Sequence, residues 1–176
     1  YSAIDALMMT PYHRVSMVYP YFSELGCSMY RGMFVCNIGY EVTDFGNEAF
    51  IDTDAVMYPY DGQTISTTFY VSENPMPYPE YAYDFIGPTL MYWPLGHTVT
   101  SADVSLYDLT SGESIDSFVS LDYSDAYSWG GIFFNPIEPL ELDHEYAVHV
   151  EGEHYDGSFE ESWTFKTQKS SKIDFP

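Results

Sequence analysis

The chain has 176 residues, of which 45% are hydrophobic and 19% aromatic, a composition typical of a folded protein and not of a disordered one. It is strongly acidic, with 27 acidic residues against 5 basic ones and a formal net charge of −22. Binding to nucleic acid or to an anionic membrane surface is therefore disfavoured, because both depend on Lys and Arg. No apolar run approaches the roughly 20 residues that cross a bilayer.

The first predicted element is a short helix over residues 2–9, which have helical composition. It is expected to end before Thr10-Pro11, because a proline disfavours helical backbone in the residue before it. Residues 10–23 contain Pro11 and Pro20 and are predicted to be irregular. The N-terminal stretch is thus expected to hold only the last turns of a helix.

A β-hairpin is predicted next, over about 25–39, with Arg31-Gly32 as its two-residue loop. This register places Cys27 directly opposite Cys36 as a non-hydrogen-bonded pair, with Cα atoms about 4.5 Å apart. That separation is within the range of a disulfide. A disulfide favours an oxidising, extracellular or cell-surface location, whereas two buried free thiols are the alternative.

Residues 10–39 also contain a set of residues in a characteristic order: His13-Arg14, Pro20, Phe22, Glu24, Gly26 and Gly39. Up to the Arg31-Gly32 turn, this segment resembles the closing half of a bacterial CAP (SCP-like) domain, the family of cysteine-rich secretory, antigen 5 and pathogenesis-related proteins. The family site is a tetrad of two His and two acidic residues. The resemblance assigns only the second His to this segment, as His13.

His13 is accordingly the candidate metal ligand of this segment, by resemblance. No HxxxH or HxxE pair accompanies it, so the other ligands would have to come from elsewhere. The alternative interpretation is a histidine that fixes a turn by hydrogen bonding next to Arg14.

Beyond a boundary near residue 50, short strands alternate with turn signals, as in a β-sandwich. Turns are predicted at Tyr60-Asp61-Gly62, Ser111-Gly112, Asn135-Pro136 and Asp156-Gly157. The Pro-rich residues 73–80 are predicted to be loop or polyproline conformation. The predicted strands are 55–58, 65–71, 89–92, 98–106, 114–120, 129–134, 145–151 and 158–167.

The last two strands allow a register to be predicted. With Asp156-Gly157 as a two-residue loop, Val150 faces Trp163 and Val148 faces Phe165. The apolar residues of both strands then share one face, so these four side chains are predicted to lie in the core.

The segments DAVMYPYDGQTISTTFY and PLELDHEYAVHVEG, with the closing WTFKT, resemble the bacterial Ig-like domain that often follows a CAP domain. The predicted fold is therefore mainly β: a C-terminal Ig-like antiparallel β-sandwich preceded by a small α+β CAP-domain remnant of a short helix and a hairpin. The corresponding domains are residues 1–50 and 51–176.

The last hairpin also collects acidic residues. In the predicted register Glu153 faces Glu160 on the outer face, with Glu151 beside them and Asp156 at the tip. Like charges directly opposite are destabilising unless a cation lies between them, so Ca²⁺ is a candidate ligand here. The alternative is a solvated acidic surface. Two weaker candidates are Asp52 with Asp54 as a cation site, and Tyr78, Tyr81 and Tyr83 as a sugar- or peptide-binding platform, with ordinary core packing as the alternative for the tyrosines.

No enzyme activity is predicted, since the sequence has neither a Gly-x-Ser-x-Gly elbow nor a Gly-rich phosphate loop. The leading hypothesis is a non-catalytic extracellular or cell-surface structural or adhesive protein, including a self-assembling, filament-type subunit. The first alternative is an Ig-like module that binds a glycan, a cell-wall component or a protein. The second is a truncated CAP protein with a divalent-cation site. The expected partners are other copies of the chain or another extracellular protein or glycan, with no nucleic acid and no membrane span.

Overall fold

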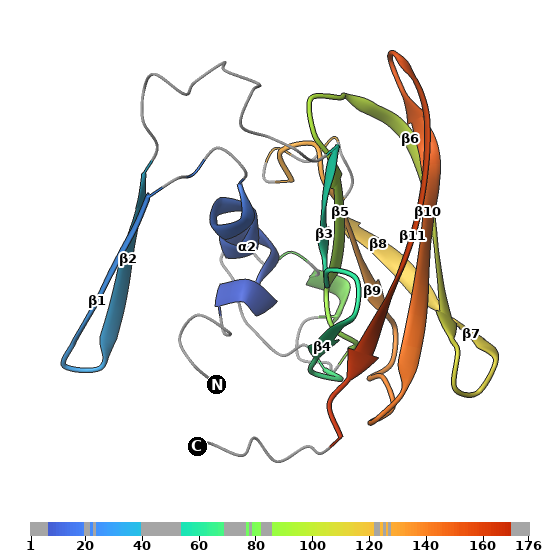
Figure 1. Ribbon diagram of the computed structural model, residues 1–176, viewed down its shortest axis with the longest axis horizontal. Coiled ribbons are helices and arrows are strands. Elements are labelled where there is room, and N and C mark those ends of the chain that lie inside the picture. Colours follow the sequence, from blue (N-terminus) through green and yellow to red (C-terminus); the bar gives the residue numbers. More distant parts are fainter. Residues whose placement is uncertain are drawn as a thin grey trace.

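The computed structural model describes residues 7–19, 22, 24–39, 54–68, 77, 79–81, 86–121, 124, 126 and 128–169. In this part of the chain the fold is mainly β and almost entirely antiparallel, as the sequence predicted (Figure 1). No helix in the described ranges is long and apolar enough to cross a membrane. Of the predicted elements, the first five residues of the 2–9 helix lie outside the described residues, and residues 7–9 are helical.

Two sheets form the main body. The five-stranded sheet has the order β4-β11-β10-β6-β7, and the four-stranded sheet has the order β3-β5-β9-β8. Every described strand pair is antiparallel except β11 with β4, which is parallel. The strands are β3 (Ala55–Tyr58), β4 (Gln63–Ile65), β5 (Leu90–Pro94), β6 (Val99–Asp108), β7 (Glu113–Ile115), β8 (Ser117–Leu121), β9 (Ile132–Pro136), β10 (Glu145–His154) and β11 (Gly157–Thr167).

One hydrophobic core joins the two sheets. Leu90 and Phe134 enter it from the four-stranded sheet, and alternate residues of β10 and β11 enter it from the five-stranded sheet. The four residues predicted to be in the core are all buried: Val148, Val150, Trp163 and Phe165. This prediction is confirmed.

The predicted register of the last hairpin is wrong by two residues. The turn is Tyr155-Asp156, so Val148 faces Trp163 and Val150 faces Glu161. A shift of two keeps every side chain on its predicted face, which is why the core assignment still holds.

The observed register has a packing reason. It places Gly152 opposite Phe159, and a Cβ on Gly152 would come within 2.7 Å of the Phe159 ring and would also clash with the Ser101 carbonyl of β6. The ring therefore covers a position that only glycine can occupy, whereas the predicted register would place Phe159 opposite His154 and lose this fit.

Two other predictions about the β elements are corrected. The predicted strand 114–120 is two strands, β7 and β8, which belong to different sheets and meet at Asp116. The predicted turn at Asn135-Pro136 is part of strand β9. Asn135 is fully buried there, and its Nδ2 donates hydrogen bonds to Gly87 O (3.1 Å) and Thr89 Oγ1 (3.0 Å). Asn135, which was predicted to form a turn, is thus a buried residue of the sheet that joins β9 to residues 87 and 89 by hydrogen bonds. The turns predicted at Asp61-Gly62 and Ser111-Gly112 are present.

The remaining strand predictions differ mainly in extent. The predicted strand 65–71 is shorter and earlier, as β4, with residues 66–68 outside any strand and 69–71 outside the described residues. Within the predicted loop 73–80, the described part contains the start of a 3₁₀ helix, η3 (Pro79–Tyr81). Strand ends are set by pairing partners, which local composition does not identify.

The prediction of irregular structure over residues 10–23 is wrong for helix α2 (Pro11–Val18). Thr10 is the N-cap, and Pro11 occupies the first turn, where its missing N–H would lack an intrahelical partner in any case. The helix ends at Val18, because the C-cap Tyr19 is extended and precedes a proline. Pro11 therefore begins a helix and does not only end the preceding one.

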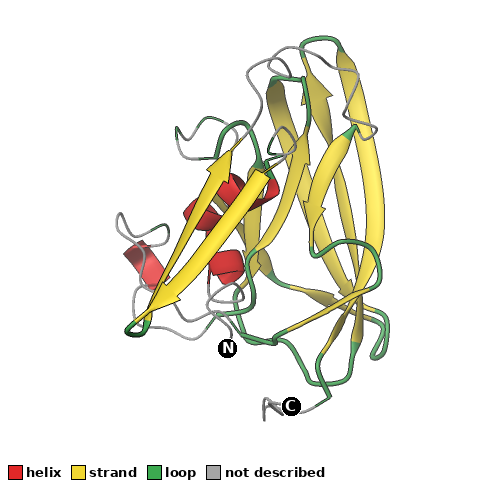
Figure 2. Ribbon diagram, turned by 60° about the vertical axis from the view of Figure 1, so that its left-hand side comes forward, coloured by secondary structure: helices red, strands yellow, loops and turns green. Residues whose placement is uncertain are grey.

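Helix α2 covers the outer face of the four-stranded sheet (Figures 1 and 2). Val15 packs against Met91, Trp93 and Phe133, which point away from the shared core. Arg14 is also buried: its Nε donates to Met8 O (2.6 Å) and its Nη1 to Thr89 O (2.8 Å). The helix is thus joined to the sheet by both apolar and polar contacts.

Strands β1 (Glu24–Tyr30) and β2 (Met33–Gly39) form a separate two-stranded sheet. In Figure 1 it stands apart from the two packed sheets, with α2 between. Cys27 pairs with Cys36 and is joined to it by a disulfide with a Cα–Cα distance of 4.1 Å, close to the value for a non-hydrogen-bonded pair. The predicted hairpin, register and disulfide are confirmed.

Candidate functional site

The hairpin β1–β2 exposes an unusual amount of apolar surface. Five of its large apolar side chains are between 58% and 69% exposed, whereas Ile38 is half-buried: the five are Leu25, Met29, Tyr30, Met33 and Val35. Every residue of β1 is exposed. Isolated exposed apolar residues are ordinary, but a contiguous group of them marks an interaction surface.

The strand register divides these residues between the two faces of the hairpin, with Leu25 and Met29 on one face and Tyr30, Met33 and Val35 on the other. Residues directly opposite each other in an antiparallel pair share a face, so Leu25 with Ile38 and Cys27 with Cys36 lie on the same side as Met29. We call these five residues the hairpin face. It contains no charged or polar side chain, and the disulfide joins its two strands near the middle.

The hairpin face continues into a groove at the base of the hairpin. Met17 and Phe22, from α2 and the segment after it, border a groove of about 250 Å³ together with Glu24, Leu25 and Ile38. The groove is close to an aromatic cluster in which the Tyr19 ring packs on Phe22 (4.9 Å between centroids) and against Trp129 (5.2 Å). Trp129 is 49% exposed. A partner that covers the hairpin could therefore also reach aromatic surface.

The hairpin carries little charge, unlike the rest of the molecule. Within residues 24–39 the charged residues are Glu24, at the base, and Arg31, in the turn at the tip. The Arg31 guanidinium lies 5.2 Å from the centroid of the Tyr30 ring. The hairpin is thus a neutral arm, with one charge of each sign at its two ends, on a chain of net charge −22.

His13, the predicted metal ligand of the N-terminal segment, is an exposed residue of α2. Its Nδ1 lies 3.2 Å from Thr10 Oγ1, a local contact in the first turn of the helix. Among the described residues, the one group of three potential ligand side chains that lie close together does not include His13.

The predicted acidic cluster is arranged differently from the prediction. Glu151 is the residue that faces Glu160, while Glu153 faces Ser158, because of the two-residue shift. Glu151 Oε2 lies 3.9 Å from His149 Nε2. Asp156 is grouped with two histidines and not with the three glutamates.

These histidines are His97, before β6, and His154, at the end of β10. Their rings stack with centroids 4.2 Å apart and an interplanar angle of 17°. Asp156 Oδ2 lies 3.7 Å from His97 Nδ1, and the Asp156 N–H donates to His154 Nδ1 at 3.2 Å. Neither histidine was predicted from the sequence to be a ligand. The available signal was that each accompanies a turn, Gly96-His97 and His154-x-Asp156, but nothing in the sequence indicates that the two turns meet.

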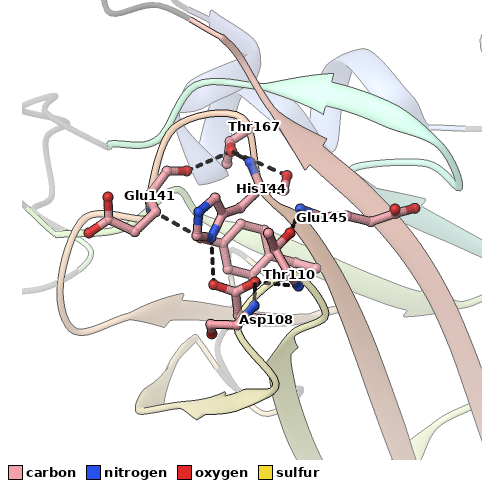
Figure 3. A network of polar contacts seen from close by, with 8 residues as sticks. Asp108, Thr110, Glu141, His144, Glu145 and Thr167 are labelled. Atoms are coloured by element: carbon pink, nitrogen blue, oxygen red, sulfur yellow. Dashed lines mark hydrogen bonds and ion pairs between the residues drawn. The ribbon is translucent and has the colours of Figure 1, made fainter.

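A second histidine–carboxylate pair lies at the opposite end of β10 (Figure 3). Asp108 is buried, and its Oδ2 lies 2.7 Å from His144 Nδ1. Its Oδ1 accepts hydrogen bonds from the N–H groups of Thr110 (2.8 Å) and Ser111 (3.2 Å). Burial by itself raises the pKa of Asp108, but the hydrogen bonds from His144 and from these backbone groups outweigh it and lower the pKa below its usual value.

The remaining contacts of this network are structural. Thr167 Oγ1 donates to Glu141 O (2.6 Å) and accepts from the His144 N–H (3.0 Å), and the Glu145 N–H donates to Thr110 Oγ1 (2.9 Å). Figure 3 shows that these groups bond to one another. The network joins the ends of β6, β10 and β11.

Of the weaker candidates, Tyr81 is half-buried and stacks on Phe118 with centroids 4.3 Å apart, which agrees with ordinary packing. Asp54 is exposed. Tyr78, Tyr83 and Asp52 lie outside the described residues.

Neither a comparison with models of known protein families nor one with curated protein sequences finds a match for this chain. The resemblances to CAP and Ig-like domains thus depend on the quoted residues alone. Any functional conclusion has to be drawn from the chemistry of the sites described above.

Proposed function

We propose that this chain belongs to a non-catalytic extracellular or cell-surface structural protein that associates with further copies of itself through the hairpin β1–β2. The apolar hairpin face, whose most exposed large side chains are Leu25 and Met29, carries this proposal. The disulfide at its centre supports the location, since such bonds persist in oxidising compartments.

We also propose that residues 51–176 are an Ig-like sandwich and residues 1–50 a remnant of a CAP domain. Two antiparallel sheets that share one core support the first assignment. A short helix followed by a hairpin, in the order of the quoted landmarks, supports the second. The two parts are in contact, because Val15 and Arg14 of α2 pack on the four-stranded sheet.

Physical arguments favour a partner for the hairpin. An isolated two-stranded hairpin is marginally stable in water, and its outer edges present unpaired backbone groups. Burial of the apolar face against a partner contributes a favourable free energy of about 25 cal/mol per Å² of apolar area. The disulfide also reduces the conformational entropy that the hairpin loses on binding.

A second copy of the chain is the partner that the charges favour. Most of the molecule is acidic, so two copies repel each other least where the neutral hairpins meet. If two hairpin faces stack about a two-fold axis that lies between them and is perpendicular to their strands, the tip of each lies over the base of the other. Arg31 of one copy then approaches Glu24 of the other, twice per pair.

The test is the molar mass of the intact chain by sedimentation equilibrium in 0.5 M NaCl, with electron microscopy of the same samples. We expect concentration-dependent association that Leu25→Ser with Met29→Ser abolishes. Leu109→Ser is the matched control, because Leu109 is 53% exposed but lies far from the hairpin, in the β6–β7 turn.

Charge reversal gives a second, sharper test. Glu24→Arg and Arg31→Glu should each weaken association, and the double variant should restore it, because the pairing across the two-fold axis is regained. A monomer at every concentration and salt level would contradict self-association. Equal loss in both single variants without recovery in the double variant would contradict the two-fold arrangement alone.

The aromatic cluster favours a second candidate function, the binding of a glycan. Trp129 presents about half of its surface to solvent, against Tyr19. Tyr and Trp at a surface often mark an interface. A glycan array probed with the wild type and with Trp129→Ala separates the two functions, because self-association through the hairpin does not require Trp129.

A further inference from the structure

We propose that His97, His154 and Asp156 form a binding site for a divalent transition-metal ion, with Zn²⁺ as the best-fitting ion. This inference is independent of the hairpin. It also differs from the Ca²⁺ predicted from the acidic residues of the same turn.

The donor chemistry selects the type of metal. Two imidazoles and one carboxylate supply two nitrogen ligands and one oxygen ligand, a set suited to Zn²⁺ and to Cu²⁺ or Ni²⁺. Ca²⁺ instead takes six to eight oxygen ligands. Three protein ligands leave a position of a tetrahedral ion for water or for another ligand.

The distances are close to those of a formed site. One ligand atom from each of the three residues lies within 4.8 Å of the other two, and His97 Nδ1 is 3.7 Å from Asp156 Oδ2. Bonds of about 2.0–2.1 Å in a tetrahedral zinc site separate neighbouring ligand atoms by about 3.3 Å. The donors need to approach one another by about half an ångström to an ångström and a half. His97 and Asp156 are exposed, so side-chain rotation can bring the donors together and turn the His97 ring out of its stack on His154.

The scaffold already holds the two turns together without a metal. The Tyr155 N–H donates to Thr98 O (3.3 Å), and Thr100 Oγ1 donates to Glu153 O (3.2 Å). These bonds join the loop that carries His97 to the turn that carries Asp156. The His154 ring is also parallel to the Phe159 ring, with centroids 6.2 Å apart. The entropy of bringing the ligands together is therefore largely lost on folding and not on metal binding.

Metal binding has to open the stack of the His97 and His154 rings, because an imidazole nitrogen binds a metal in the plane of its ring and two nearly parallel rings cannot both do so for one ion. Beyond this stack, one hydrogen bond has to be exchanged. His154 Nδ1 accepts one solvent-exposed hydrogen bond from the Asp156 N–H, and coordination through this nitrogen exchanges that bond for a metal bond while water takes over the N–H. The net charge of −22 raises the local concentration of cations around the molecule.

The experiment is isothermal titration calorimetry of the untagged intact chain with ZnCl₂, together with thermal melts in ZnCl₂ and in CaCl₂. We expect one Zn²⁺ per chain and a melting temperature that rises with Zn²⁺ at concentrations where Ca²⁺ has no effect. His97→Ala, His154→Ala and Asp156→Ala should each weaken binding by more than about tenfold, since even residues that only support a ligand contribute about 10–100-fold. His149→Ala is the matched control, because His149 also lies on β10, contacts Ser162 and is outside the group.

Circular dichroism without metal tests whether each variant is folded. If a variant is not folded, His97→Gln is measured in its place. NMR of the histidine ring protons in the wild type adds an independent readout, in which Zn²⁺ should shift His97 and His154 and leave His144 unchanged. Absence of Zn²⁺ binding, equal stabilisation by Ca²⁺, or undiminished binding by the His97 and His154 variants would each overturn the proposal.

Discussion

The guanidinium of Arg14 lies 3.9 Å from the centroid of the Tyr58 ring, and this contact joins helix α2 to β3, the edge strand of the four-stranded sheet. Arg14 is buried, and it also donates to the carbonyls of Met8 and Thr89. The Arg14 side chain thus connects helix α2 to Met8 in the preceding turn, to Tyr58 in β3 and to Thr89 directly before β5.

Arg14→Met should lower the free energy of unfolding by about 2–4 kcal/mol, because it leaves buried carbonyls without this donor and removes the cation–π contact. Urea denaturation measures the change. Lys169→Met, at a side chain that is 86% exposed, should stay within about 0.5 kcal/mol. An Arg14 variant as stable as this control would mean that the helix is held by Val15 and its apolar neighbours alone.

Gly152→Ala should destabilise the chain by at least about 1–3 kcal/mol, the usual range for overpacking. The added Cβ meets the Ser101 carbonyl and the Phe159 ring, and a backbone carbonyl in a central strand pair cannot withdraw easily. Gly26→Ala is the control, because a Cβ there has no neighbour within 4 Å. If both changes were equally mild, the Gly152–Phe159 packing would not determine the register.

Asp108→Asn should destabilise the chain by about 1.5–3 kcal/mol at pH 7, through the loss of hydrogen bonds to a charged acceptor. The pKa of Asp108 is lowered in the folded state, so its contribution is present above the ordinary Asp pKa of about 3.9 and is lost as the pH falls through the folded value. The difference in urea stability between the wild type and the variant should therefore shrink as the pH is lowered from 7 towards 3. The exposed Asp116→Asn is the comparison, and a difference that does not change with pH would contradict the assignment.

Reduction of the Cys27–Cys36 disulfide should loosen the hairpin but leave the packed sheets intact. The closed loop is short, so we expect a loss of about 2–3 kcal/mol of local stability. Hydrogen exchange of the amides in β1 and β2 should accelerate, with β10 and β11 unchanged, and self-association should weaken. A large fall in the melting temperature of the whole chain on reduction would show that the hairpin contributes to the main core.

Prediction from sequence succeeded where local patterns determine the structure. The Cys27–Cys36 pairing follows from a turn of two residues, and the burial of Trp163 and Val148 follows from strand alternation. It failed where distant residues decide. The sequence predicted a turn at Asp156-Gly157, but the turn lies at Tyr155-Asp156. We attribute this register to Gly152, which packs against Phe159 and against Ser101 of a different strand.

The same limit applies to the sites. The hairpin was predicted, but the exposure of its face depends on what α2 leaves uncovered. His97 and His154 come together only because the turns before β6 and after β10 are adjacent in the five-stranded sheet. Pro11 was interpreted as a helix breaker, since sequence alone did not show that Thr10 would serve as the N-cap of a second helix.

The parallel pair β4–β11 has a mechanical consequence. β4 is entered near residue 61, β11 is left near residue 168, and the two strands run in the same direction, so tension between these points pulls them lengthwise past each other. Their three residue pairs, Phe165 with Gln63, Lys166 with Thr64 and Thr167 with Ile65, must then separate together and not one after another. A subunit that carries load along its chain would therefore resist extension more strongly at the β4–β11 pair, which is loaded in shear, than at the hairpin β1–β2. The two strands of the hairpin are joined at the tip, so under load they open pair by pair from the base as far as the disulfide.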